Sequence, residues 1–249
     1  NTHIENVMVM ESTLHVNCAN NALNLITNAG FEGGLIAGEL SGCTVYNCEV
    51  RGGRAVNNTT SGVQALGGEG LYMSAFAGYV DNSTIEYSRV TPTRNDDGTV
   101  KAATDVTNKY DVAAGALGGN NVYASGFVGR MGGGAQIVDC FSTAKCYSYS
   151  ASYVGVVAVT LAWSGGLAGR IDKADGNAIT RSHYAGDLSS RQYNPVAVIP
   201  IIQNDVNLGG IAGRANNGDA VITDCYYKRK HVGLEPRRRL EEDGLCARG

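Results

Sequence analysis

The chain has 249 residues, of which 34 are glycine and only 4 are proline, and its formal net charge is −3. Charged residues make up 17% of the chain, below the usual ~25%, whereas glycine is nearly twice as frequent as its background of about 7%. The small net charge creates no overall field that would draw the protein to nucleic acid or to an anionic membrane. The glycines follow no Gly-X-Y period, which excludes collagen, and no apolar run reaches the ~18–20 residues of a membrane-spanning helix.

A short phrase recurs five times along the chain. Each copy has a box of glycine, hydrophobic and small residues, followed by a strand-like run that reaches a Cys or Ser. Such self-similarity is typical of a solenoid, in which each unit buries its apolar edge against its neighbours. The final glycines of the boxes lie 40, 51, 40 and 44 residues apart, at Gly38, Gly78, Gly129, Gly169 and Gly213.

In chain order, the opening stretch 3–17 predicts the strands of a first rung. Segment 91–121 is polar and rich in glycine, and it predicts a surface loop. Segment 185–207 carries two prolines in an apolar run, which favours an edge strand or a packed loop. We therefore expect one domain over 1–227 and a charged, flexible tail over 228–249. The repeats cover 33–50, 74–90, 125–142, 165–184 and 209–227.

Two columns of residues run through the repeats, one hydrophobic and one of Cys or Ser. Their members always stand three residues apart, although strict alternation along a strand would place them on opposite faces. The offset predicts a bend or bulge between two inward-facing positions. The core column contains Val45, Ile85, Ile137, Ile179 and Ile222, and the Cys/Ser column contains Cys48, Ser88, Cys140, Ser182 and Cys225.

The cysteines of this column are expected to be free and buried. If successive rungs stack ~4.8 Å apart, these cysteines lie two rungs apart, roughly 10 Å. A disulfide needs Cα atoms within about 7 Å, so the thiols should pack as small hydrophobes. Pairing within a repeat, of Cys43 with Cys48 or of Cys140 with Cys146, stays open.

In the boxes, the last glycine would allow close approach of the next rung, and a large hydrophobe would fill the core. The hydrophobes are Leu35, Phe76, Phe127, Leu167 and Ile211. Both features serve to pack one rung against the next, so we assign them a structural role. We therefore place any recognition in the unrepeated stretches, chiefly 91–121 and 185–207.

These boxes and strands resemble the GLUG repeat of large bacterial surface proteins, whose pattern runs roughly as GGLVG, a turn and TISNCYATG. Copies 33–50, 165–184 and 209–227 match it most fully, and the resemblance covers about 90 residues directly. It implies a right-handed parallel β-helix of about five to six irregular rungs with long loop insertions. Members occur in adhesin-like proteins and in non-catalytic regions of immunoglobulin A peptidases, so the resemblance implies an extracellular or cell-surface location and no catalytic residues.

Carboxylates are the first candidates for chemistry, because β-helices also host glycosidases and lyases. Asp139 and Asp224 precede the Cys/Ser column two rungs apart, close to the ~6.5–9.5 Å separation of an inverting glycosidase. Arg181 occupies the same position on the rung between them, and we favour a surface ladder in which it neutralises both. We assign no catalytic residue and take the two aspartates as the carboxylates to test.

Tyrosines beside asparagines could contact a sugar or a protein, because tyrosine offers a large area with a polar tip. The candidates are Tyr147, Tyr149, Tyr193 and Tyr226, and stacking between rungs is the alternative that we favour. The four histidines lack the spacing of a metal site, and segment 172–177 reads as an Asp/Asn-Gly turn rather than a calcium loop. We expect no metal and no cofactor.

Three functions remain open. The leading hypothesis is a non-enzymatic module of a larger surface protein, acting as a stalk or adhesin on a host or matrix protein or a glycan. The second is a carbohydrate-active β-helix enzyme or the scaffold part of a secreted peptidase. The third is a protomer that stacks end to end into a filament, since an exposed end rung is an edge that can pair with another chain.

Overall fold

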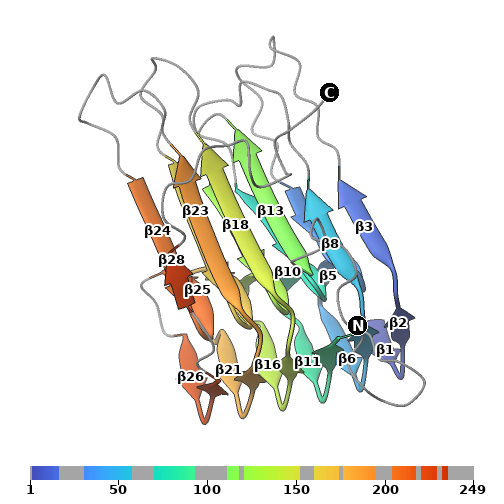
Figure 1. Cartoon of the computed structure of the whole chain (residues 1–249). Coiled ribbons are helices and arrows are strands. Elements are labelled where there is room, and N and C mark those ends of the chain that lie inside the picture. The colour runs from blue at the N-terminus through green and yellow to red at the C-terminus, as the bar shows by residue number, and fades with distance from the viewer. Residues whose placement is uncertain are drawn as a thin grey trace.

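The computed structural model describes residues 2–16, 31–57, 70–92, 111–117, 121–151, 160–173, 176–193, 204–216, 220–228 and 232–234. Every regular element in these ranges is a β-strand, and the strands form five parallel sheets (Figure 1). Each sheet takes every fifth strand along the chain, so the chain coils through the five sheets in turn. The predicted parallel β-helix is confirmed, with five complete rungs and a sixth of three strands.

The first two sheets of each rung are made of short strands. Sheet A holds β1 (Thr2–Glu5), β6 (Cys43–Tyr46), β11 (Thr84–Glu86), β16 (Gln136–Val138), β21 (Ala178–Thr180) and β26 (Val221–Thr223). Sheet B holds β2 (Met8–Met10), β7 (Glu49–Arg51), β12 (Arg89–Thr91), β17 (Phe141–Ser142), β22 (His183–Tyr184) and β27 (Tyr226–Tyr227).

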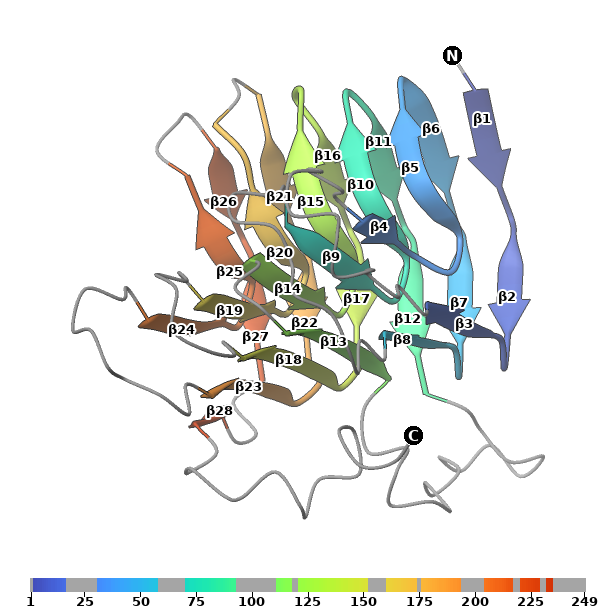
Figure 2. The ribbon, with the colours of Figure 1, turned by 90° about the horizontal axis from the view of Figure 1, so that it is seen from above.

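The other three sheets complete the rung. Sheet C holds β3 (Thr13–Val16), β8 (Arg54–Asn57), β13 (Val112–Leu117), β18 (Cys146–Ala151), β23 (Leu188–Tyr193) and β28 (Val232–Leu234). Sheet D holds β4 (Phe31–Gly33), β9 (Leu71–Ser74), β14 (Asn121–Ser125), β19 (Thr160–Gly165) and β24 (Asn204–Gly209). Sheet E holds β5 (Ala37–Ser41), β10 (Ala77–Asp81), β15 (Val128–Gly132), β20 (Ala168–Ile171) and β25 (Ala212–Ala215). Seen from above, the rungs follow one another in chain order (Figure 2).

The corner between sheets A and B confirms the predicted bend. One residue in each rung adopts the left-handed backbone there, with φ between 46° and 56°. That conformation turns the chain between two inward-facing positions, so the core column and the Cys/Ser column both point into the core. Ile85, Ile137 and Cys140 are buried there. The corner residues are Asn6, Asn47, Tyr87, Asp139, Arg181 and Asp224.

Serine and cysteine alternate in their column, and the serine hydroxyls accept hydrogen bonds from the backbone. The backbone N–H of Cys48 donates to Oγ of Ser88 at 3.0 Å, and the N–H of Cys140 donates to Oγ of Ser182 at 3.0 Å. The hydroxyl of each serine thus satisfies a backbone donor of the preceding rung inside the core. The five described cysteines are free thiols, including both members of the Cys43 and Cys48 pair and of the Cys140 and Cys146 pair.

The boxes form the corner between sheets D and E, with one correction to the predicted hydrophobes. Ile36, not Leu35, is aligned with Phe76, because the N–H of Ile36 donates to the carbonyl of Phe76 at 2.8 Å, as the N–H of Phe76 does to Phe127 at 3.0 Å. The register runs without an insertion from Gly33, paired with Met73, to Ala37, paired with Ala77, so Leu35 takes the place that glycine or alanine takes in later rungs. There its side chain covers Gly53.

Later rungs fill the same space from the opposite side. The place of Leu35 is taken by Gly166 in the fourth rung, and a Cβ on Gly166 would lie 2.5 Å from the ring of Tyr184. Tyr184 is buried, and its hydroxyl donates to the carbonyls of Ala144 and Asp187 at 2.7 and 3.0 Å. Each pair of facing corners therefore combines one large side chain with one glycine. In the first case the box carries the large residue, Leu35, and in the second the box carries the glycine, Gly166.

Sheets C and D pack on each other through small residues. Ser148 exchanges hydrogen bonds with Ser164 at 2.9 Å and with Ser190 at 2.5 Å, and all three side chains are buried. Ser164 and Ser190 also donate to backbone carbonyls of the facing sheet. Serine, alanine and glycine let the two sheets approach closely while the buried hydroxyls remain paired.

This packing overturns the loop prediction for part of 91–121. Residues 112–117 form β13 in the interior of sheet C, and Val112, Ala113 and Ala114 are buried. A strand that faces another sheet at close range needs small side chains. Alanine and glycine are also common in loops, so the composition of this segment suggested a loop. In 185–207, β23 is likewise an interior strand of sheet C and β24 is an edge strand of sheet D. Residues 93–110 and 194–203 lie outside the described residues.

Strand pairing extends past Tyr227. β28 lies within the stretch expected to be a tail, and it pairs with β23 through Val232, Gly233 and Leu234. Residues 235–249 lie outside the described residues. No helix long and apolar enough to cross a membrane occurs in the described part of the chain.

Candidate ligand-binding face

The two candidate carboxylates lie at the corner between sheets A and B, where Arg181 forms an ion pair with one of the two, Asp139. Nε and Nη2 of Arg181 donate to the two carboxylate oxygens of Asp139 at 2.8 and 2.7 Å. These hydrogen bonds lower the pKa of Asp139. Asp224 is exposed one rung further on and acts on Arg181 through its charge alone. A carboxylate held ionised by arginine is poorly suited to act as a general acid.

Two of the four candidate tyrosines do not lie on the surface, which corrects the prediction. Tyr147 and Tyr149 are each 8% exposed, and their rings stack with centroids 6.5 Å apart. They lie on one face of β18, two residues apart, and this face is covered. The side chain of Tyr193 lies outside what the structure describes. Of the four, Tyr226 is exposed, by 63%.

Tyr226 takes part in the stacking between rungs that the sequence favoured. Its ring lies 4.8 Å from that of His183 with an angle of 2°, and His183 lies 5.0 Å from Phe141 with an angle of 3°. In such a stack the ring faces contact one another and only the edges point outward. His183, which lies between the other two rings, therefore presents no flat face on which a sugar ring could stack.

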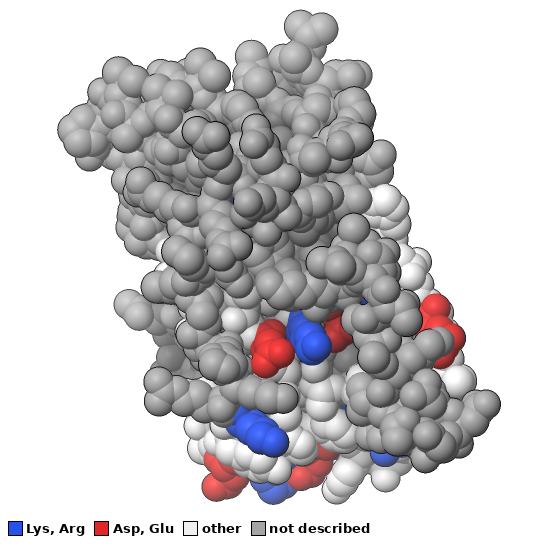
Figure 3. Space-filling model, viewed as in Figure 1, with Lys and Arg blue, Asp and Glu red and all other residues white. Residues whose placement is uncertain are grey.

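A second face, which the sequence reasoning missed, carries a column of arginines on sheet E. Arg130, Arg170 and Arg214 follow the last glycine of the third, fourth and fifth boxes, and the strand register places them side by side. The recurring Gly-Arg pair was the signal in the sequence that could have revealed them. Elsewhere on the surface, in the view of Figure 3, acidic and basic side chains are interspersed.

Beside the arginines, sheet D carries a column of stacked aromatic rings. Tyr72, Tyr123 and Trp163 are buried, with successive centroids 4.6 Å apart. The guanidinium of Arg214 lies over the Trp163 ring at 5.0 Å, a cation–π contact. Nη1 of Arg170 donates to the Tyr72 hydroxyl at 2.9 Å, and burial raises the pKa of that hydroxyl to about 12.

The final glycines of the boxes allow the arginine column of sheet E and the aromatic column of sheet D to pack closely. A Cβ on Gly129 would lie 3.0 Å from Cβ of Tyr72, and one on Gly169 would lie 3.2 Å from Cβ of Tyr123. On Gly78 it would lie 2.5 Å from the backbone of Glu32 and Gly33. The same backbone position in the first and last boxes is taken by Gly38 and Gly213. The absence of a side chain thus lets sheets D and E meet in a tight corner.

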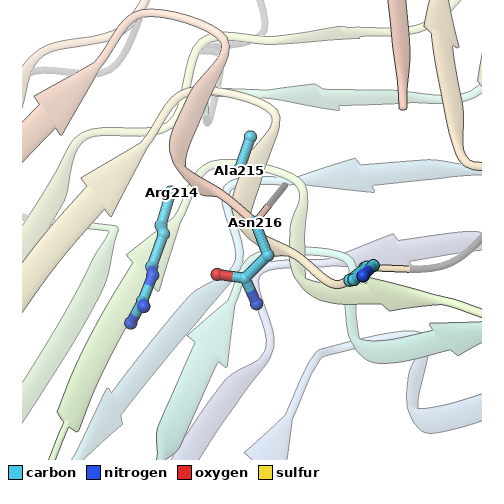
Figure 4. A pocket seen from close by; sticks show the side chains of 4 residues that line it. Arg214, Ala215 and Asn216 are labelled. Atoms are coloured by element: carbon cyan, nitrogen blue, oxygen red, sulfur yellow. The ribbon is translucent and has the colours of Figure 1, made fainter. Parts of the chain in front are cut away.

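Charge on this face is compensated unevenly. The carboxylate of Asp172 joins Nε of Arg130 and Nε of Arg170, both at 2.6 Å, and Glu32 approaches Arg130 at 3.3 Å. Beyond Arg170, an open hollow of about 410 Å³ is lined by Lys173, Arg214, Ala215 and Asn216 (Figure 4). Arg214 and Lys173 are both exposed.

The remaining chemistry of the described residues is limited. Within the ranges that the structure describes, no group of three or more His, Cys, Asp or Glu side chains could hold a metal ion. Asp172 of the predicted turn accepts a hydrogen bond from Nε of Arg130 and forms an ion pair with Arg170. Asn177 Oδ1 accepts from the N–H groups of Gly134 and Ala135 at 3.2 and 2.9 Å. Comparison with known proteins found no matching family model, curated protein or solved structure.

Proposed function

We propose that this chain is a non-enzymatic module of an extracellular, bacterial surface protein, where it acts as a rigid stalk or ligand-binding segment. The observation that carries the proposal is how the ionisable side chains are used. Glu49, Asp139 and Asp172 are each bound by arginine, and each of these ion pairs links neighbouring rungs. Charged groups arranged in this way hold successive coils in register rather than activate a substrate.

The composition of the core supports a mechanical role as well. Core column members Val45, Ile85, Ile137 and Ile179 are completely buried, and Phe76 stacks on Phe127 with centroids 4.6 Å apart. Stacked rungs of this kind form a stiff rod whose length grows by ~4.8 Å per coil. Ligand contacts would then come from residues that do not repeat, and segments 93–110 and 194–203 belong to the two unrepeated stretches that the sequence favours for recognition.

An array of glycans and matrix proteins probed with the purified chain tests the proposal. We expect binding that is lost when 95–108 or 195–202 is replaced by a short Gly-Ser linker, while replacement of the exposed ladder residue Arg181 by Gln leaves it intact. Incubation with polysaccharides tests the enzymatic alternative. Turnover that disappears in Asp139→Ala or Asp224→Ala would refute the non-enzymatic proposal.

The outer rungs favour a second candidate, end-to-end stacking of copies. Ile222 of the core column is 42% exposed, although Ile137 and Ile179 in the same column are completely buried. Met8 and Met10 are exposed in the first rung. Light scattering across a concentration series tests this candidate. Growth in mass that Ile222→Lys abolishes supports it, and a monomer at every concentration argues against it.

A further inference from the structure

The arginine column of sheet E contains an internal example of anion binding. Asp172 lies two residues after Arg170 and one rung after Arg130, and its carboxylate bridges the two Nε atoms. The N–H of Asp172 donates to the carbonyl of Met131 at 2.9 Å, which fixes the position of the aspartate relative to the preceding rung. Two neighbouring arginines in this column therefore accommodate one carboxylate between them.

The next rung repeats this arrangement without the carboxylate. The N–H of Asn216 donates to the carbonyl of Ile171 at 2.9 Å, the same bond that Asp172 makes one rung earlier. Ile171 is paired with Ala215 in the sheet, so Asn216 occupies the place of Asp172. Arg170 and Arg214 correspondingly occupy the places of Arg130 and Arg170. The acidic residue of the pattern is thus replaced by a neutral amide beside an additional arginine.

From this substitution we infer that Arg214, Lys173 and Asn216 form a binding site for an oxyanion, the carboxylate, sulfate or phosphate group of a ligand. The bound group would lie in the open hollow beside the Asn216 side chain, which itself takes the place of Asp172 in this rung. Arg214 would donate two parallel hydrogen bonds, Lys173 would add a second positive charge, and the Asn216 amide would donate from the floor of the hollow. The inference goes beyond the proposed function, because the site lies on the body of the solenoid and not on its insertions.

Several observations suit a ligand rather than a buried ion pair. The three residues line an open hollow, and Arg214 and Lys173 are exposed while Asn216 is half-buried (Figure 4). The guanidinium of Arg214 lies over the ring of Trp163, and this contact restricts its position beside the hollow. The nearest carboxylate of the column, that of Asp172, is already engaged by Arg130 and Arg170.

Trp163 provides the assay, because it is the only tryptophan of the chain and Arg214 lies against its ring. The purified chain is titrated with sodium sulfate, sodium phosphate and sodium glucuronate, each compared with sodium chloride at equal ionic strength. We expect a saturable change in Trp163 fluorescence with a Kd of about 1–10 mM, the range of a few charge-assisted hydrogen bonds at an open site. A rise in Tm with the same concentration dependence provides a second readout.

Variants separate a specific site from general salt effects. Asn216→Asp restores the carboxylate of the preceding rung, so it should fold normally and weaken oxyanion binding at least about tenfold. Arg214→Gln should abolish binding, whereas Arg181→Gln, which removes an exposed arginine at a distant corner, should leave it unchanged. The anion that binds most tightly identifies the source as an acidic sugar or as a sulfated or phosphorylated group. A response equal to that of chloride, or unchanged binding in Asn216→Asp and Arg214→Gln, would overturn the inference.

Discussion

Glu49 offers the sharpest test of how charged residues hold the rungs together. Its carboxylate lies on sheet B, buried, and accepts from Arg51 on its own rung at 2.8 and 3.0 Å. From the next rung it accepts from Arg89 at 2.7 and 3.0 Å and from the Thr91 hydroxyl at 2.9 Å. Burial alone would raise the pKa of Glu49, but these hydrogen bonds reverse the effect and lower it from 4.5 to about 2.

The shift in pKa sets both the size and the pH dependence of the contribution. The difference between 4.5 and about 2 corresponds to about 3 kcal/mol of stability, at roughly 1.4 kcal/mol per pH unit. Because the pKa is lower in the folded state, this stability is fully present above pH 4.5 and is lost as the pH falls toward 2. Glu49→Gln resembles the protonated form, so we expect it to cost about 2–3 kcal/mol at pH 7 and nearly nothing at pH 2.

Urea unfolding of the wild type and of Glu49→Gln at pH 7, 4 and 2 measures this difference. The matched control is Glu5→Gln, since Glu5 is exposed and contacts exposed His3, and it should change stability by less than about 0.5 kcal/mol. A cost for Glu49→Gln that is the same at all three pH values would show that the carboxylate acts through shape and not through charge. A cost below about 0.5 kcal/mol at pH 7 would refute the role of the cluster altogether.

Three further predictions concern the core. Gly166→Ala should lower stability by about 1–3 kcal/mol in thermal or urea unfolding, because its Cβ would collide with the carbonyl oxygen of Gly210 and with the buried ring of Tyr184. An unchanged Tm would contradict this packing. Ile137→Ala should cost about 2–5 kcal/mol, whereas the same change at Ile222, which is exposed in the last rung, should cost much less; equal costs would mean that the last rung is buried in solution. Burial raises the pKa of the Cys140 thiol to about 12, so mass spectrometry should find it unmodified by iodoacetamide at pH 8 in the folded protein and modified in urea, and rapid labelling of the folded protein would refute its burial.

The general architecture was predictable because stacking imposes the same requirement on every coil. The core column at Val45, Ile85 and Ile137 needs apolar side chains, and the left-handed corner after it explains the three-residue offset to Cys48. Both follow from local chemistry that each rung repeats. They could therefore be found by aligning the chain with itself.

Features that depend on how neighbouring coils fit were harder to predict. β13 is rich in alanine and glycine because sheet D lies close behind it, and nothing within the segment itself distinguishes it from a loop. Tyr147 and Tyr149 were expected at the surface, but their face of sheet C is covered. In both cases the environment is set by residues of other segments.

The repeat, the parallel stacking of strands and the inward columns follow from the amino-acid sequence alone, because they depend on the type of residue at a recurring position. The alignment of Ile36 with Phe76 and the ion pairs along the arginine column depend on how the folded coils pair with one another. Asn216 is structurally equivalent to Asp172, 44 residues earlier, because matching backbone hydrogen bonds place both residues at the same point of successive rungs. Register of this kind is a property of paired strands, so the pattern within one copy of the repeat cannot specify it.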